Sequence, residues 1–239
     1  MTVPAIVDIA PHTPESKYSA VFLDFGGVLS PPIEDLFAEY ERKTGIAPSD
    51  LKAAMAGVAD RLGVDVLAPV ELGMLTEQEW VQGLHTWLTA RNIDVSRSEL
   101  EFGRQWFAGH EVNSVIRDLA VQLRGSGYRV GILTNNVREW EPYWRPMVGL
   151  DDEVDVIVDS YAVRLRKPDP EIFALAAERI GVPGTKAILV DDLRVNCDAA
   201  ENAGWGAVQF VETSSALADL ARLLTTTSEG LSLIHISEP

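Results

Sequence analysis

The sequence predicts an α/β fold: a doubly wound, Rossmann-like parallel sheet that is interrupted after its first strand by a helical insertion. Two observations lead to this prediction. From about residue 111 onward, short apolar runs alternate with segments of helical period, which is the pattern of βαβ units. Before that point, one apolar run at residues 20–24 is followed by roughly 75 to 80 residues in which apolar side chains recur at helical spacing alone.

The first half of the chain is expected to hold a leader, one strand and the helical insertion. Residues 1–17 contain three prolines and no sustained period, so we predict a mostly extended leader there. The first strand follows at residues 20–24, and Pro31 and Pro32 break the chain soon after it. Apolar spacing then predicts four helices, the third opened by a capping box at Thr76 and Glu79: residues 35–43, 51–62, from 76 onward, and 98–107.

The second half of the chain is expected to supply the rest of the sheet and its flanking helices. Pro170 suits the first position of one of these helices, with Asp169 as its N-cap. We predict strands at residues 129–134, 154–159, 187–191 and 207–211, and helices at 112–124, 170–180, 195–203 and 214–224. The α/β core is therefore assigned to residues 18–32 and 111–228. Residues 231–239 resemble the translation of an adapter used in sequencing libraries, so we leave them out as a non-native tail.

Composition and charge narrow the class of function. The chain has 239 residues, a formal net charge of −16 and a pI near 4.6, which argues against nucleic acid or an anionic membrane as a partner. A small phosphorylated substrate stays possible, because one metal ion and one lysine can reverse the local potential. The single cysteine, Cys197, allows no internal disulfide and favours a reducing, cytoplasmic location. No apolar run reaches the roughly 18 residues that a membrane span needs.

Four short motifs carry the candidate chemistry. Asp24 ends the first apolar run and leads into a Gly-rich turn, and Thr134-Asn135 end the second run. Lys167 precedes a turn and a helix start, and Asp191-Asp192 end a further apolar run. Ligands of doubly wound sheets bind at the carboxyl ends of the strands, where these side chains are expected to meet.

This order of carboxylate, hydroxyl, lysine and carboxylate pair resembles the four motifs of the haloacid dehalogenase superfamily. The resemblance covers about residues 20–211 and implies a Mg²⁺-dependent phosphatase of a small phosphorylated metabolite, with residues 33–110 as its helical cap. It implies that Asp24 is the nucleophile and that Thr134, Asn135 and Lys167 bind the phosphoryl oxygens. Mg²⁺ would be held by the following groups: Asp24, the carbonyl of Gly26, Asp191 and Asp192, of which we favour Asp192 over Asp191 as the direct ligand. The oligomeric state is left open.

One position departs from the pattern of these phosphatases. They usually carry a second Asp two residues after the nucleophile, which acts as general acid and base, and here that position is Gly26. Two other readings therefore stay open: a 2-haloacid dehalogenase, which needs no carboxylate at this position and no metal, and a non-catalytic protein that binds phosphate and metal. The Asp191-Asp192 pair argues against the metal-free reading.

Two further sets of residues permit a structural or a functional interpretation. Asn196 and Asp198 follow the carboxylate pair and could hydrogen-bond around the site or serve as helix caps and surface residues. The aromatic residues of the insertion are expected to form helix-bundle core rather than a substrate pocket: Trp80, Trp87, Trp106 and Phe107.

Overall fold

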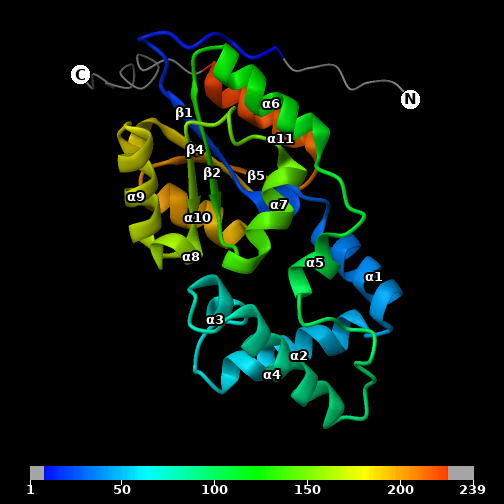
Figure 1. The fold of residues 1–239 in the computed structure, drawn as a ribbon. Coiled ribbons are helices and arrows are strands. Elements are labelled where there is room, and N and C mark those ends of the chain that lie inside the picture. Colours follow the sequence, from blue (N-terminus) through cyan, green and yellow to red (C-terminus); the bar gives the residue numbers. More distant parts are fainter. Residues whose placement is uncertain (1–7, 226–239) are drawn as a thin grey trace, which may run out of the picture.

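The computed structural model describes residues 8–225, which contain a five-stranded parallel sheet in the order β3-β2-β1-β4-β5 (Figure 1). Every pair of neighbouring strands is parallel, which confirms the predicted doubly wound α/β fold. The chain reverses direction across the sheet next to β1, so the carboxyl end of β1 lies at the switch point where such sheets bind ligands. The strands are β1 (Ala20–Leu23), β2 (Arg129–Thr134), β3 (Val156–Asp159), β4 (Ala187–Asp191) and β5 (Gly206–Gln209).

The central strand is buried on both faces, and its side chains alternate between two hydrophobic layers. Val21 and Leu23 belong to the layer beneath α6 (Ser114–Gly125), α7 (Glu141–Val148) and α11 (Thr213–Leu224). Ala20 and Phe22 belong to the layer beneath α9 (Pro170–Ile180) and α10 (Arg194–Asn202). The two sets of helices lie on opposite sides of the sheet in Figure 1. Because helices cover both faces of the sheet, a ligand can reach it only at the ends of the strands.

The chain between β1 and α6 forms a helical layer beyond the carboxyl ends of the strands (Figure 1). Its helices are α1 (Ile33–Thr44), α2 (Pro48–Asp60), α3 (Ala68–Glu71), α4 (Glu77–Thr89) and α5 (Phe102–Phe107). The capping box at the start of α4 is present as predicted, with Thr76 Oγ1 accepting from Glu79 N and the Glu79 carboxylate accepting from Thr76 N. Trp80 is fully buried in this layer, in agreement with the expected helix-bundle core.

Several predicted boundaries differ from the structure. The helix expected at residues 98–107 begins only at Phe102, because Ser98 instead turns its hydroxyl to the Tyr40 hydroxyl and the His85 ring. Val211, placed in the last strand, lies beyond its end and is 77% exposed. Asp169 occupies the N-cap of α9, but its side chain makes no capping hydrogen bond.

Three short α-helices of the described chain were not predicted: α3, α7 and α8 (Ser160–Val163). α3 and α8 have four residues each, too few to display a period. α7 carries Pro142 in its first turn and Pro146 in its interior, and proline is a helix breaker in sequence analysis. Pro142 is tolerated because the first turn has no internal acceptor for its missing N–H.

The ends of the described chain are tied to the core in different ways. Ile9 is buried, and Tyr128 donates its hydroxyl to the carbonyl of Ala10 at 3.1 Å, so part of the expected leader packs against the sheet domain. The suspected tail at residues 231–239 lies outside the described residues. Across residues 8–225, no helix combines the length and the apolar character required to cross a bilayer.

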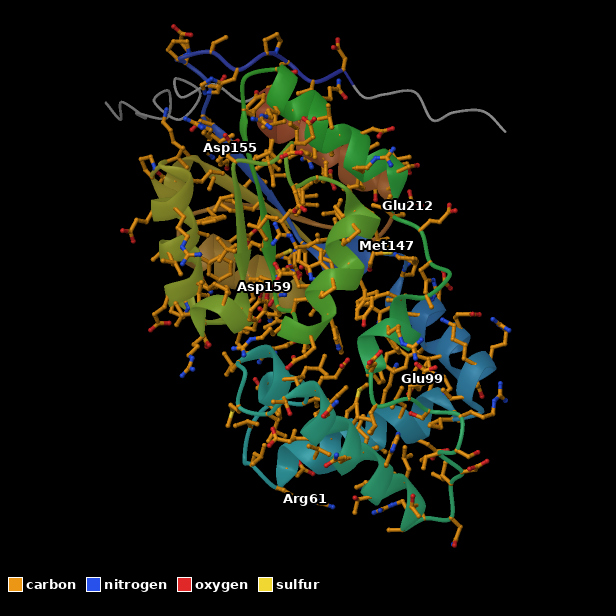
Figure 2. The ribbon with its side chains drawn as sticks, in the orientation of Figure 1. Arg61, Glu99, Met147, Asp155, Asp159 and Glu212 are labelled. Atoms are coloured by element: carbon orange, nitrogen blue, oxygen red, sulfur yellow. The ribbon has the colours of Figure 1, made fainter. Side chains whose placement is uncertain are left out.

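Asp159 is a buried carboxyl group at the end of β3. Figure 2 labels it at the end of the sheet that faces the helical layer. Its Oδ2 has no hydrogen-bond partner among the described residues, and its Oδ1 accepts only a long bond of 3.4 Å from Tyr161 N. Burial raises the pKa of Asp159 from 3.8 to about 8. The folded protein therefore keeps this proton through a pH range in which the unfolded chain releases it.

We expect Asp159→Asn to become more stable than the wild type as the pH rises. The pKa of Asp159 is higher in the folded state, so between about pH 4 and pH 8 this group ionises in the unfolded chain while it stays protonated in the fold. The free energy of unfolding of the wild type therefore falls progressively over this range. The amide cannot ionise, so the difference in free energy of unfolding between variant and wild type should grow by a few kcal/mol, on the order of 1.4 kcal/mol per pH unit at most. Chemical denaturation at several pH values measures it.

Asp155→Asn is the control with the opposite sign. Burial of Asp155 is outweighed by the backbone N–H of Val130 and by Arg129, so the pKa of this carboxyl group is lowered. This variant should be less stable than the wild type at neutral pH, and the difference should shrink as the pH falls below about 4. A stability difference for Asp159→Asn that stays constant from pH 4 to pH 8 would contradict the assignment.

Candidate active site

Asp24 follows directly on β1 and opens a tight turn at Phe25–Leu29. Its backbone is still extended, and its N–H continues the sheet by donating to the carbonyl of Val190. Asp24 Oδ1 accepts from the N–H of Phe25 at 2.7 Å. The buried strand and the turn therefore hold this carboxylate at the carboxyl edge of the sheet.

The two glycines of the turn differ in what they allow. Gly26 has φ −63° and ψ 124°, a conformation open to any residue, and a Cβ added there would meet only Ile33 Cδ1, at 3.8 Å. Gly27 has φ 69°, and its added Cβ would lie 2.5 Å from Asp192 Oδ2. Gly27 is thus required both by its backbone and by the close approach of Asp192.

Lys167 lies between two of the predicted acidic residues and is almost completely buried. Its Nζ is 2.9 Å from Asp24 Oδ1 and 2.5 Å from Asp191 Oδ2. Burial alone would lower the pKa of Lys167, but Asp191 and Asp24 outweigh it and raise this pKa above its ordinary value. The ammonium group therefore stays charged and joins β1 to β4.

Asn135 holds the backbone of this lysine. Its Nδ2 donates to the carbonyl of Lys167 and its Oδ1 accepts from the N–H of Lys167, both at 2.8 Å. Asn135 was predicted to bind the phosphoryl oxygens. Its side chain also fixes the backbone of Lys167, a role that the sequence did not indicate.

Asp191 and Asp192 differ in environment. Asp191 is fully buried, and its Oδ1 accepts from the N–H of Leu193 and from Asn196 Nδ2, both at 2.9 Å, while its Oδ2 faces Lys167. Asp192 is partly exposed and lines the adjacent cavity. Asn196 therefore belongs to the site, whereas Asp198 pairs with Arg194 on the surface of α10.

Three carboxylates gather at this point, and Lys167 is the one buried cation within residues 8–225. One oxygen from each of Asp24, Asp191 and Asp192 lies within 4.8 Å of the others. The pKa of Asp24 is raised well above its ordinary value, first by burial and then by its two acidic neighbours, although Lys167 opposes this. Burial and the charge of Asp191 raise the pKa of Asp192 to about 6. Uncompensated negative charge on hard oxygen donors is the setting that suits a divalent cation such as Mg²⁺.

A cavity of about 910 Å³ extends from this cluster toward the helical layer. Asp24, Gly26, Lys167 and Asp192 line one end of it. Trp106 and Phe107 are buried in the hydrophobic core, as expected, and they also line this cavity. The sequence did not indicate this second position, because a buried helix face and a pocket wall show the same apolar spacing.

Thr134 ends β2, and its side chain is buried. Its Oγ1 has no hydrogen-bond partner among the described residues, and the same holds for Nδ2 of Asn136. Asn136 lines the cavity next to Asn135. Buried donors without partners are uncommon in proteins, and here they lie beside the acidic cluster, where an anionic oxygen could accept from them. Asn136 was not predicted as a site residue.

Arg166 links the helical layer to the site. It forms ion pairs of 2.8 Å with Glu71 of α3 and 2.9 Å with Asp65, and both partners line the cavity. Ser160 adds a second link by donating to the carbonyl of Glu71 at 2.7 Å while it accepts from the N–H of Asn136. Arg166 directly precedes Lys167 in the chain, so this contact attaches α3 to the segment that carries the buried lysine.

We expect Gly27→Ala to weaken binding of divalent cations and to destabilise the fold, whereas Gly26→Ala should do neither. A Cβ at residue 27 would displace the Asp192 carboxylate and strain a backbone with positive φ, at a cost of roughly 1 to 3 kcal/mol. A Cβ at residue 26 meets only an ordinary contact with Ile33. Calorimetric titration with Mg²⁺ and denaturation of both variants measure the two effects. Equal Mg²⁺ affinity in both variants would show that Asp192 is not a ligand of the cation.

Solved structures share this fold. A HAD family enzyme from Bacteroides thetaiotaomicron, in complex with magnesium and inorganic phosphate, matches with a TM-score of 0.60 and 21% identity over 84% of this chain and 98% of that one. L-2-haloacid dehalogenase from Xanthobacter autotrophicus, with chloropropionic acid covalently bound, matches with a TM-score of 0.61 and 18% identity over 86% of each chain. At such low identity these matches establish the fold.

Sequence comparison gives shorter matches and the family. The chain is 34% identical over 97 residues to glyceraldehyde 3-phosphate phosphatase of Pyrococcus abyssi, which is 39% of this chain and 40% of that protein. Matches to the first curated relatives span between 10% and 40% of their lengths. The family model of haloacid dehalogenase-like hydrolases matches residues 18–204, which is most of the chain. The protein is therefore a member of the haloacid dehalogenase-like hydrolases.

Proposed function

We propose that this hydrolase is a Mg²⁺-dependent phosphatase of a small phosphorylated metabolite and that it acts through an aspartyl-phosphate at Asp24. The observation that carries the proposal is the cluster of Asp24, Lys167, Asp191 and Asp192 at one end of a large cavity. Similarity to proteins named as phosphatases supports it, including the Pyrococcus abyssi protein. A cytoplasmic location, expected from the single cysteine, is part of the same proposal.

The residues present fit a magnesium ion. Asp24 and Asp192 both line the cavity, as does Gly26 in the turn that follows Asp24, so the two carboxylates and the Gly26 carbonyl would hold the ion. Asp191 already uses its two oxygens for Leu193, Asn196 and Lys167, which favours Asp192 as the direct ligand and Asp191 as the support behind it. Bound there, Mg²⁺ would offset the repulsion between the anionic nucleophile and the anionic phosphoryl group.

The chain's own side chains account for the rest of the reaction. Asp24 Oδ1 is engaged by Phe25 and Lys167, which leaves Oδ2 as the oxygen to attack phosphorus. Lys167 would stabilise the charge on the transferring oxygens, because its ammonium is fixed before the reaction begins. Thr134 and Asn136 would donate to phosphoryl oxygens from groups that have no other partner among the described residues. Water would then release phosphate from Asp24.

We propose further that residues 33–110 act as a cap that closes the cavity over the substrate. α1, α2 and α5 supply much of the cavity wall, and Arg166 with Glu71 connects this layer to the sheet domain. Excluding bulk water strengthens the electrostatic interactions of the buried lysine with the substrate. A 2-haloacid dehalogenase would use the same Asp24 but would leave Asp192, a partly exposed carboxylate of the crowded cluster, without a task, so the phosphatase is favoured.

Asp24→Asn should remove nearly all phosphate release and leave the fold intact, because an amide is a far weaker nucleophile than a carboxylate. We expect a loss of at least about 10³-fold in kcat, the scale on which enzymes lose rate when a reacting group is removed. The assay is phosphate release from 4-nitrophenyl phosphate and acetyl phosphate, with and without Mg²⁺, on protein checked by circular dichroism.

Chelator should abolish the wild-type activity and added Mg²⁺ should restore it, while Asp192→Ala should require far more Mg²⁺. Chloride release from 2-chloropropionate without metal would favour the dehalogenase reading. Absence of both activities, with Mg²⁺ and phosphate still binding, would favour the non-catalytic one. Near-normal turnover by folded Asp24→Asn would reject the nucleophile assignment.

Gly26→Asp should raise the rate on alkyl phosphates by about 10-fold or more and change the rate on 4-nitrophenyl phosphate little. The added carboxyl group can protonate a poor leaving group, and general acid catalysis contributes about 10²- to 10⁴-fold where it is well placed. The backbone at Gly26 accepts a side chain without strain, so the variant is expected to fold. Rates across phosphate esters of graded leaving-group pKa test this. Gly26→Asn, of equal size but without the acid, is the control and should give no gain.

A further inference from the structure

The cavity beside Asp24 has a largely apolar wall. Beyond the acidic cluster it is bounded by apolar side chains of three helices of the helical layer. They include Ile33, Leu36 and Phe37 of α1, Met55 of α2, and Trp106 and Phe107 of α5. At about 910 Å³ the cavity is large enough for a drug-sized ligand.

Apart from the exposed Asp60 and Lys52, the polar side chains on this wall are already engaged with other parts of the protein. Arg166 is paired with Glu71 and Asp65. Trp140 donates its ring N–H to Glu77, and Ser30 donates its hydroxyl to the carbonyl of Pro31.

Lys52 is exposed at the wall, with its ammonium 4.5 Å from the ring centre of Phe37. Asn136, whose Nδ2 has no partner among the described residues, lies next to Asn135 at the phosphoryl end of the cavity. A polyhydroxylated leaving group would thus lose most of its hydrogen bonds to water with few replacements, which is unfavourable.

The absence of an acid at Gly26 also disfavours a polyhydroxylated leaving group. A leaving oxygen that receives no proton from residue 26 must depart as an anion, which is easier for a phenol than for an aliphatic alcohol. An apolar wall also stabilises an aromatic ring by removing its apolar surface from water. The apolar wall and the missing acid therefore favour, for independent reasons, a substrate whose leaving group is a phenol.

We propose that the substrate is the phosphate monoester of an apolar phenol, an aryl phosphate whose ring and apolar substituents lie between α1, α2 and α5. This rests on the proposed phosphatase function. Asp24 would attack phosphorus as the bond from phosphorus to the aryl oxygen breaks. The phenolate would leave and take a proton from solvent water, and a second water would hydrolyse the aspartyl-phosphate to inorganic phosphate and Asp24.

The test is a series of 4-alkylphenyl phosphates with hydrogen, ethyl, butyl and hexyl substituents, assayed with Mg²⁺. The leaving-group pKa is almost constant along this series, so a change in kcat/KM reports burial of the chain. We expect kcat/KM to rise by at least about 10-fold from phenyl to butylphenyl, since one buried methylene is worth up to about fourfold. Glucose 6-phosphate and glycerol phosphate should be cleaved at least 10-fold less efficiently than phenyl phosphate.

A pair of matched variants locates the effect in the cavity. Met55→Gln keeps the size of the side chain but puts an amide in the wall, and it should flatten the dependence on chain length, whereas Met55→Leu should retain it. Met147→Gln makes the same change on α7 at a residue that does not line the cavity, and it should leave the dependence unchanged.

The outcomes separate the two proposals. Release of phosphate from neither 4-nitrophenyl phosphate, acetyl phosphate nor any aryl ester would reject the phosphatase itself. Hydrolysis of 4-nitrophenyl phosphate with no gain along the alkyl series, or a preference for the sugar phosphate, would reject the apolar substrate and leave the phosphatase standing. If Met55→Gln does not fold, the wild-type series decides alone.

Discussion

The buried ammonium of Lys167 between Asp24 and Asp191 is the interaction on which the site depends. It joins the carboxyl ends of β1 and β4, and the three groups are almost removed from solvent. A single buried charge would be costly there, so each partner is tolerated only because the others are present. The side chain of Asn135 completes the arrangement from β2 by fixing the backbone of Lys167. Three neighbouring strands are thereby tied together at one edge of the sheet.

The ion pairs leave an excess of negative charge, which explains the chemistry proposed for the site. Asp24, Asp191 and Asp192 carry three potential charges against one lysine, and burial raises the pKa of Asp24 and Asp192. A divalent cation would remove this excess and would make room for an anionic phosphoryl group. The same electrostatic imbalance that is unfavourable in the protein alone therefore becomes favourable when metal and substrate are bound.

Sequence reasoning predicted the strands, and the meeting of Asp24, Lys167 and the Asp191-Asp192 pair at their ends, more readily than it predicted the other contacts of the site. Strand ends were predictable because an apolar run that stops at a polar residue marks the edge of a buried sheet, as at Asp24 and Asp191. The contact of the Asn135 side chain with Lys167 was not predictable, because Lys167 lies 32 residues further along the chain. The pairing of Glu71 with Arg166 spans 95 residues and begins in a helix too short to show a period. Such contacts depend on tertiary packing alone.

The conformation of Gly26 was also beyond prediction, and it changes how the missing acid is understood. A glycine after a nucleophile could be required by a positive φ, which would explain the absence of a carboxylate by backbone strain. Here φ is −63° and the space beside Cα is open, so the fold does not demand glycine at this position, whereas it does at Gly27. The absence of the acid is thus compatible with a substrate that does not need one. Because the wall formed by α1, α2 and α5 is apolar as well, backbone geometry and cavity lining lead to the same class of leaving group.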